Sequence, residues 1–435
     1  MYYTIAQVAE KLAVTKDTLR RWDASGKLKP IRHPVSNYRV YPADALAPFE
    51  SLGITFNSDT VFEVEPEQPT QAFSVIELFA GAGGLAIGME QAGLQCAMLN
   101  ELNKDACKTL VKNRPHWDVR QGDIKDLDFT EFAGKIDVVT GGFPCQAFSY
   151  AGRQLGFEDA RGTLFFEFAR AVKEIQPLIC IGENVRGLVN HDNGKTLAGM
   201  VSVLDELGYD VLAPRVLKAI HHRVPQKRER LLIVGLRKDA GLKFDFPQAN
   251  KDIFTMADAL KKGRLFDADV PKSEGQPYPL KKKQIMDLVP PGGYWRDLPL
   301  DIQKSYMMKS FFLGGGKTGM ARRLAWDEPS LTLTCNPAQK QTERCHPEQT
   351  RPLTVREYAR IQTFPDAWQF VGSVSSCYKQ IGNAVPVNLA QAIGQSVVKS
   401  LNSYYAANPA LVVQPAPSET APKARSKSKK QLALV

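Results

Sequence analysis

Hydrophobic and polar residues alternate at helical spacing in the first part of the chain. Apolar positions recur every three or four residues from 4 to 12, and a second pattern of this kind runs from 16 to about 23. Two short helices across a tight turn are typical of a helix-turn-helix. A strand pattern follows, so that residues 27–41 fit a β-wing. We therefore expect a small winged helix-turn-helix unit in residues 1–50.

Strand and helix patterns alternate again further along the chain. An acidic, proline-containing stretch at 51–72 indicates a linker before them. The most regular helix pattern covers 164–175. The alternation predicts an α/β fold with a largely parallel sheet. The predicted strands are short and apolar, and they lie at 74–79, 96–100, 136–140 and 177–181.

Two stretches lack a regular pattern. Between about 240 and 330, lysine, glycine and proline are mixed with isolated apolar residues, and no elements can be assigned. The end of the chain is rich in proline, alanine, serine and lysine, which predicts disorder. The chain then divides into a first unit, a linker, an α/β body in two parts around a variable region, and a basic tail: 1–50, 51–72, 73–240, 241–345, 346–402 and 403–435.

Composition narrows the class of protein. Of the 435 residues, 43% are hydrophobic and 23% are charged, as in ordinary folded proteins. We expect no membrane span, because no apolar run is long enough, and no secretory signal at the start. The seven cysteines include no Cys-x-x-Cys pair, which favours a reducing, cytoplasmic compartment. The net charge of +10 is compatible with a polyanionic partner.

A glycine-rich turn follows the first strand of the α/β body. Residues 79–85 read Phe-Ala-Gly-Ala-Gly-Gly-Leu, and such a turn allows a ligand to approach the backbone closely. The pattern is neither the dinucleotide motif nor a phosphate loop, and alone it fits a plain strand-to-helix turn equally well. Glu101 and Asp123 at later strand ends suit ribose hydroxyls and an adenine amino group. Together these features favour a nucleoside-containing cofactor.

A cysteine stands in the loop after the strand at 136–140. Residues 141–146 read Gly-Gly-Phe-Pro-Cys-Gln. A lone cysteine is usually a small buried hydrophobic residue. Cys145, however, lies in a Gly-Pro loop at a strand end, where catalytic residues gather, and Pro144 restricts the backbone just before the sulfur. Cys145 is therefore a candidate nucleophile.

At this point the sequence resembles a known family. Phe-Pro-Cys-Gln resembles the catalytic motif of the carbon-5 cytosine DNA methyltransferases. Further motifs of that family follow in order, at 156–166, 183–185, 225–230, 356–365 and 380–386. The resemblance covers about residues 74–400 except 240–330. It implies a Rossmann-like class I methyltransferase fold, a mixed sheet with helices on both faces, and a small target-recognition domain. Residues 3–9 and 18–22 resemble the winged helices of MerR and excisionase proteins.

The resemblance implies a covalent mechanism. Addition of the Cys145 thiolate to carbon-6 of cytosine makes carbon-5 nucleophilic toward a methyl donor. Glu183 would act on ring nitrogen N3, for which it has to be buried, and Asn184 would orient it. Arg230, with Arg228 as a second candidate, would hold the base oxygen. The base must leave the stacked duplex, and residues 147–155 would close over it as a mobile loop.

The implied methyl donor is S-adenosyl-L-methionine, and the implied substrate is double-stranded DNA. The predicted cofactor contacts combine the glycine-rich turn, the two carboxylates, the loop before the cysteine and a late asparagine: Phe79, Gly81, Gly83, Gly84, Leu85, Glu101, Asp123, Ile124, Gly142, Pro144 and Asn383. The predicted DNA contacts are polar or basic: Arg20, Arg21, Gln146 and Arg153. We expect a modification enzyme of a restriction-modification system, with a cognate endonuclease as a candidate partner, that acts on DNA as a monomer.

Two other functions remain open. Transfer RNA cytosine methyltransferases share the catalytic motifs, and a transcriptional regulator could retain a methyltransferase body. The long variable region and the helix-turn-helix favour DNA, and the intact Cys145, Glu183 and Arg230 favour an active enzyme. The adjacent pairs at 221–222 (His-His) and 345–346 (Cys-His) have no matching ligands, so we predict no metal site.

Overall fold

The computed structural model describes residues 2–5, 8, 16–26, 28–32, 39–42, 45–46, 66–144, 163–313 and 317–411. Three residues of the predicted site, Cys145, Gln146 and Arg153, lie outside these ranges.

The N-terminal unit combines one described helix with a three-stranded antiparallel sheet. Helix α2 (Lys16–Ala24) agrees with the predicted second helix. Strand β3 (Arg39–Pro42) lies between β1 (Tyr2–Thr4) and β2 (Ile31–Arg32). The β2–β3 pair confirms the expected β-wing, whereas β1 was not expected, because its three residues run directly into a helical pattern. These elements share a small apolar core that includes Tyr3, Val8, Leu19 and Tyr41.

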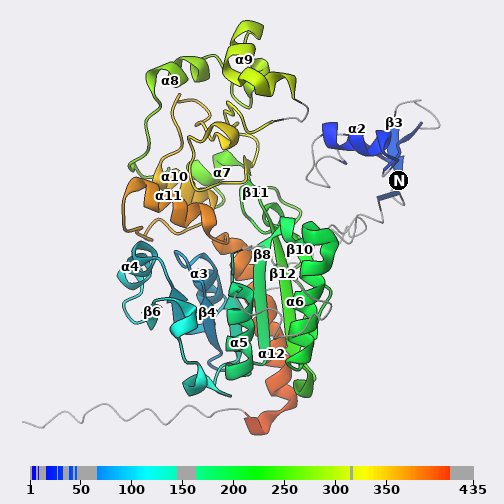
Figure 1. The fold of residues 1–435 in the computed structure, drawn as a ribbon, viewed down its shortest axis with the longest axis vertical. Helices are drawn as coiled ribbons and strands as arrows, with labels where there is room; N and C mark the ends of the chain where they lie inside the picture. Colours follow the sequence, from blue (N-terminus) through cyan, green and yellow to red (C-terminus); the bar gives the residue numbers. More distant parts are fainter. Residues whose placement is uncertain are drawn as a thin grey trace, which may run out of the picture.

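An eight-stranded mixed sheet forms the centre of the α/β body (Figure 1). Its order is β10-β12-β8-β7-β4-β5-β6, and β9 also pairs with β12. The neighbours from β6 to β8 run parallel, while β12 and β10 are antiparallel to the strands beside them. The strands are β4 (Ser74–Leu78), β5 (Gln95–Glu101), β6 (Val119–Gln121), β7 (Val138–Gly141), β8 (Ile179–Val185), β9 (Tyr209–Val211), β10 (Arg215–Lys218) and β12 (Glu229–Arg237).

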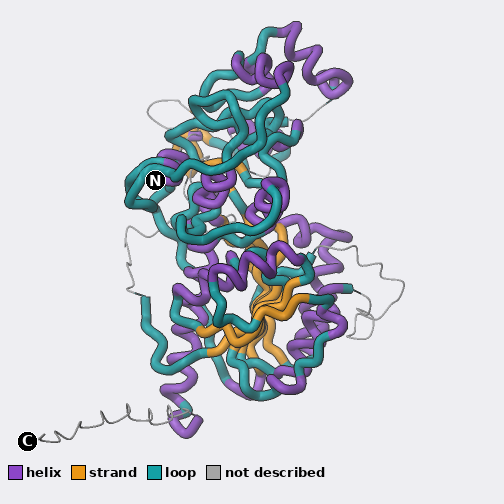
Figure 2. Tube along the Cα trace, turned by 90° about the vertical axis from the view of Figure 1, so that its left-hand side faces the viewer, coloured by secondary structure: helices purple, strands orange, loops and turns teal. Residues whose placement is uncertain are grey.

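Helices cover both faces of this sheet, as Figure 2 shows from the side. Helices α3 (Gly84–Gln91) and α12 (Val387–Ala407) pack on one face, and α5 (Leu164–Ile175) and α6 (Lys195–Glu206) pack on the other. The strands are apolar on both sides, since successive residues such as Val138 and Val139 belong to opposite cores. The expected class I methyltransferase architecture is therefore present.

The variable region contains short helices around two apolar cores. Met256 and Leu260 pack with residues of the α/β body, while Met286 and Trp295 belong to a separate cluster that extends to Cys345. The region expected as one block at 241–345 is thus shared between the body and a smaller unit. Its elements and the following ones are α7 (Met256–Leu260), α8 (Leu280–Asp287), α9 (Leu300–Met307), β13 (Ser330–Leu331), α10 (Val355–Ile361) and α11 (Val374–Asn383).

Two expected boundaries move. The end of the predicted linker is folded, because Asn402 on α12 accepts a hydrogen bond from the Thr70 amide (2.9 Å) and donates one to the Gln68 carbonyl (2.9 Å). The beginning of the predicted tail is folded too. Helix α12 continues to Ala407, and the Tyr405 hydroxyl donates to Asp137 (2.6 Å) at the start of the sheet. Both segments are held by polar contacts that no hydrophobic pattern reveals, the first by those of Asn402 and the second by that of Tyr405.

Candidate active site

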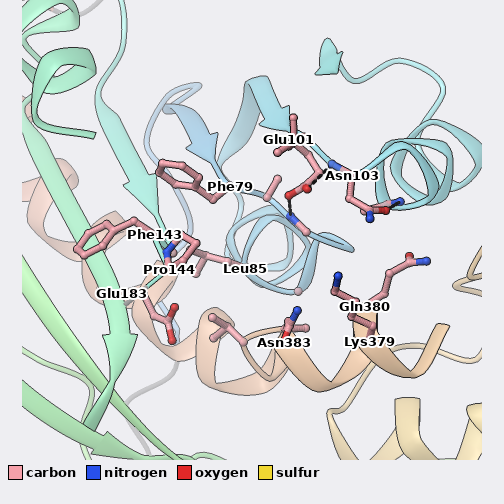
Figure 3. Close-up of a pocket in the computed structure, with 18 of the residues that line it drawn as sticks. Phe79, Leu85, Glu101, Asn103, Phe143, Pro144, Glu183, Lys379, Gln380 and Asn383 are labelled. Carbon is pink, nitrogen blue, oxygen red and sulfur yellow. Dashed lines mark hydrogen bonds between the residues drawn. The ribbon is translucent and has the colours of Figure 1, made fainter. Parts of the chain in front are cut away.

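A cleft of about 1120 Å³ opens at the carboxyl ends of the parallel strands, between the sheet and α11. Figure 3 shows Glu101 and Asn103 on one side, Phe143, Pro144 and Glu183 on another, and Asn383 facing them from α11. This is where ligands bind in open α/β sheets. Of the eleven predicted cofactor contacts, ten line this cleft.

The glycine-rich turn and Glu101 form one unit. The carboxylate of Glu101 accepts hydrogen bonds from the amides of Gly81 (2.8 Å) and Asn103 (2.7 Å). Gly81 has a φ of +56°, and a Cβ on it would meet nothing within 4 Å, so its backbone borders open space. Phe79 also has a positive φ of 59°, a conformation rare for a bulky residue and common at functional sites. The turn is therefore shaped to admit a ligand.

The other two glycines of the turn serve the helix that follows. Gly83 is the predicted contact that does not line the cleft: it is the left-handed N-cap of α3, and a Cβ there would lie 2.7 Å from Leu110. A Cβ on Gly84 would lie 2.3 Å from the carbonyl oxygen of Val385. The left-handed backbone at Gly83 thus explains the glycine, and its contact with the cofactor stays a prediction.

Further predicted contacts lie along the same cleft. Asp123 follows β6 and accepts a hydrogen bond from the Lys125 amide (3.1 Å), while Ile124 is buried beneath the cleft. Asn383 ends α11, and its Oδ1 accepts a hydrogen bond from the Cys335 thiol (3.1 Å). Asp123, Ile124 and the helix end Asn383 thus line one cleft, although more than 250 residues separate the first two from Asn383 in the chain.

A buried ion pair occupies the other end of the cleft. Glu183 on β8 and Arg230 on β12 both line it, and Glu183 Oε1 lies 2.5 Å from Arg230 Nε. The antiparallel pairing of β8 with β12 places these two side chains side by side. Gly142 lies against the same carboxylate, because a Cβ on it would be 2.9 Å from Glu183 Oε2. A carboxylate and a guanidinium in this arrangement can address the polar edge of a planar ring.

The loop toward Cys145 is held by Asn184. Its side-chain amide donates to the Phe143 carbonyl (2.9 Å), and its oxygen accepts from the Val185 amide (2.8 Å). The expectation that Asn184 orients Glu183 is therefore replaced by a role in fixing residues 143–144. Pro144 lines the cleft, so the chain leaves the described residues at the cleft wall, one position before Cys145.

Arg228 is placed differently from Arg230. Its side chain is 1% exposed, and its guanidinium donates to the carbonyls of Leu333 (3.1 Å) and Gly382 (2.9 Å). Burial, and then the charge of Arg230, hold its pKa below the usual value. Nη1 and Nη2 of Arg228 are thus directed toward the protein backbone, while its Nε has no hydrogen-bond partner among the described residues.

Residues outside every predicted motif also line the cleft. Glu77 on β4 is fully buried, and its pKa is raised by burial and by the negative charges of Glu101 and Glu183. Cys335 and residues 332–334 come from the stretch after β13, where no pattern predicted any element. Only Glu77 carried a signal, since a carboxylate within an apolar strand is unusual.

The remaining predicted residues lie outside the cleft. Arg20 and Arg21 are exposed on α2 of the N-terminal unit. His221 and His222 are buried, and His346 Nδ1 accepts hydrogen bonds from the amides of Glu348 (3.2 Å) and Gln349 (3.1 Å). Among the described residues, no three His, Cys, Asp or Glu side chains are grouped to hold a metal. No helix within them is long and apolar enough to cross a membrane.

Comparison with known proteins finds similar methyltransferases. The type II methyltransferase M.Eco47II of Escherichia coli is 60% identical over 402 residues, which is 92% of this chain and 96% of that protein. M.HhaI of Haemophilus parahaemolyticus is 34% identical over 79% of this chain and 99% of its own length. The fold resembles that of the Entamoeba histolytica methyltransferase EhMeth, with a TM-score of 0.53, 16% identity, and coverage of 76% of this chain and 99% of that one.

Two family models match separate parts of the sequence. Residues 4–41 match the MerR family regulatory protein model, which agrees with the winged unit found there. Residues 73–399 match the C-5 cytosine-specific DNA methylase model, and they include the cleft and every element around it. The chain therefore belongs to the C-5 cytosine-specific DNA methylase family.

Proposed function

We propose that this chain transfers a methyl group from S-adenosyl-L-methionine to carbon-5 of cytosine in double-stranded DNA, with Cys145 as the covalent nucleophile. The observation that carries the proposal is the Glu183–Arg230 pair. It lies at the end of the strand next to β7, and the chain after β7 reaches the cleft wall at Pro144 and continues to Cys145.

The cleft fits the proposed cofactor. Glu101, fixed by two backbone amides, offers its carboxylate to ribose hydroxyls, and Asp123, Ile124 and Asn383 would hold the rest of the nucleoside. Burial, and then the negative charges of Glu101 and Glu183, raise the pKa of Glu77. The Glu101 carboxylate at this end of the cleft suits a cationic ligand. S-adenosyl-L-methionine carries a sulfonium and an ammonium group, and when bound it supplies an electrophilic methyl group.

The protein side chains would then act on the base. The Cys145 thiolate adds to carbon-6, and this addition gives carbon-5 the electron density it lacks. Glu183 interacts with ring nitrogen N3, and Arg230 supports the adjacent base oxygen. Carbon-5 then attacks the methyl group, and the sulfonium sulfur would leave as a neutral thioether. Loss of the carbon-5 proton to a base lets the bond to carbon-6 break, with the Cys145 thiolate as the leaving group. Nη1 and Nη2 of Arg228 bind backbone carbonyls, so this scheme assigns the base oxygen to Arg230.

The biological setting follows from the relatives. M.Eco47II and M.HhaI are type II methyltransferases, so we propose that this chain is the modification enzyme of a restriction-modification system, with a cognate endonuclease as partner. We further propose that it acts in the cytoplasm as a monomer on DNA. Gln146 and Arg153, outside the described residues, are proposed to contact the DNA around the flipped base.

The match of residues 4–41 to a regulatory family supports a second proposal. The N-terminal unit would bind DNA apart from the methylated site, with Arg20 and Arg21 on α2 contributing contacts. Helices of such units commonly enter the major groove.

The function is tested by bisulfite sequencing of DNA from cells that express this chain. Wild-type protein should methylate cytosines within one recurrent sequence and so protect them from bisulfite conversion. The Cys145→Ser variant should protect none, because a serine hydroxyl without a general base is a weak nucleophile. Protection by both proteins, or by neither, would contradict the proposal.

A further inference from the structure

Two buried glutamines connect the segment after β13 to the turn that carries Asn383. The Leu333 amide donates to Gln226 Oε1 (2.9 Å), and Gln226 Nε2 donates to Gln362 Oε1 (2.8 Å). Gln362 Nε2 then donates to the carbonyls of Ile381 (2.8 Å) and Ala384 (3.2 Å). Both glutamine side chains are fully buried. We name this chain of hydrogen bonds the glutamine relay.

The direction of the glutamine relay is fixed by its ends. It starts at a backbone N–H, which can only donate, and it ends at backbone carbonyls, which can only accept. Only one orientation of the two side-chain amides therefore satisfies every group. A buried amide that lost its partner would carry a desolvation cost, so the two segments are held in one relative position.

Arg228 makes a second connection between the same two segments. It donates to the Leu333 carbonyl at one end and to the Gly382 carbonyl at the other. Leu333 is thus held through both its amide and its carbonyl. The turn 381–384 is held through four carbonyls, since Arg228 also donates to that of Asn383 (3.5 Å). The two segments also touch directly, because a Cβ on Gly382 would lie 2.3 Å from the Thr334 carbonyl oxygen.

Asn383 is the residue of this turn that links the two connections to the cleft, which it lines. Its backbone lies within the turn held by the two connections, and its side chain accepts the Cys335 thiol, two residues after Leu333. We propose that Gln226, Gln362 and Arg228 are positioning residues, which affect cofactor binding by holding Asn383 in place. This inference rests on the proposed function, because it requires the cofactor to bind at Asn383.

The test compares cofactor affinities of full-length variants without DNA. Gln226→Met and Gln362→Met keep the side-chain length and break the relay. Calorimetric titration with S-adenosyl-L-methionine should show binding weakened by roughly fivefold or more, the lower end of what an unpaired buried polar group costs. The double variant should bind about as weakly as either single variant, since one break already interrupts the relay.

Asn402→Leu is the matched control. Asn402 is also a buried amide that bridges two segments, but it does so at α12 and residues 68–70, away from the cleft. This variant should lose thermal stability to a similar degree and keep wild-type affinity. Folded relay variants with wild-type affinity would overturn the inference, and so would equal weakening by Asn402→Leu, which would indicate general destabilisation.

Two further measurements keep the outcome decisive. If the methionine variants do not fold, Cys335→Ala removes the thiol contact to Asn383 from the exposed side. Cys335→Ala should then bind S-adenosyl-L-methionine more weakly than Cys335→Ser, which keeps a donor, and equal affinities would overturn the inference.

Glu101→Ala identifies a failure of the proposed function itself. If it binds as wild type, and Asp123→Ala does so too, the cofactor site is misplaced and the inference falls with it. If it binds weakly while the relay variants do not, only the inference fails.

Discussion

At the scale of single residues, Glu101 and Asp123 carry the proposed nucleoside contacts. Both reach the cleft from strand ends, and Glu101 is held by two backbone amides. Glu101→Ala and Asp123→Ala should each weaken binding of S-adenosyl-L-methionine, because a positioned acceptor is lost at about 1 kcal/mol or more, roughly a fivefold effect. Calorimetry provides the measurement. Unchanged affinity in both variants would show that the nucleoside lies elsewhere.

Glu183 belongs to the chemical step. Glu183→Gln keeps the size of the side chain and removes its charge and its proton-transfer capacity. We expect kcat to fall by about 10²–10⁴-fold, the range typical of a lost general acid or base. Cofactor affinity should change little, since Glu183 lies at the opposite end of the cleft from Glu101. Single-turnover methylation kinetics with saturating DNA measure the effect, and a kcat near that of the wild type would remove Glu183 from the mechanism.

The motif residues were predictable because their types and order are specific. Glu183 and Arg230 are brought together as expected, although the sequence separates them by 46 intervening residues. The partners of Asn184 and Arg228 were not predictable, since a backbone carbonyl leaves no trace in the identity of the residue that carries it. Gly83 was predicted to contact the cofactor but does not line the cleft, since a glycine that caps a helix and one that borders a ligand look alike in sequence.

At the scale of elements, long apolar patterns predicted structure well. Helix α5 begins and ends where its pattern does, and Thr163 caps it by accepting the Phe166 amide (3.1 Å). Helices α7, α8 and α9 have only five to eight residues, too few for a periodic pattern to stand out among prolines and glycines. The end of α12 was missed because its last turns use tyrosines and an asparagine for docking.

The turn before β11 (Gln226–Lys227) should make stability sensitive to acid. Burial, and then the neighbouring His221, lower the pKa of His222 to about 3. The unfolded chain, with a pKa near 6.5, binds this proton first, so folding stability is complete above about pH 6.5 and falls as the pH decreases toward 3. At pH 5 the loss is about 2 kcal/mol for this group.

The His222→Gln variant isolates that contribution. Its melting temperature should fall less between pH 7 and pH 5 than that of the wild type, because glutamine does not titrate. Differential scanning fluorimetry at both pH values measures this. An identical decrease in the two proteins would mean that His222 takes up no proton on unfolding in this range.

At the scale of the whole molecule, the N-terminal unit has an apolar core of its own. M.HhaI matches over 99% of its length with only 79% of this chain, so a family member can lack a counterpart to a fifth of these residues. Deletion of residues 1–60 spares the folded contacts of Gln68 and Thr70. We therefore expect methylation kinetics and the target sequence to remain close to those of the full chain.

The same deletion should remove a second DNA-binding activity. Binding of the full chain to DNA without a methylation target should weaken steeply as salt rises, because contacts to phosphates release counterions. The truncated protein should have a shallower salt dependence, and filter binding over a range of salt concentrations measures both. A changed target sequence, or loss of folding on truncation, would contradict an independent N-terminal unit.

The central claim is that Cys145 bonds covalently to cytosine, and trapping of that bond tests it most directly. Duplex DNA with 5-fluorocytosine at the target position should form a stable adduct with the full chain in the presence of S-adenosyl-L-methionine, because fluorine at carbon-5 cannot leave as a proton. Mass spectrometry of the digested complex should place the base on Cys145, and Cys145→Ser should give no adduct. Methylation of ordinary DNA without any adduct to the fluorinated duplex, or an adduct at another residue, would contradict the account.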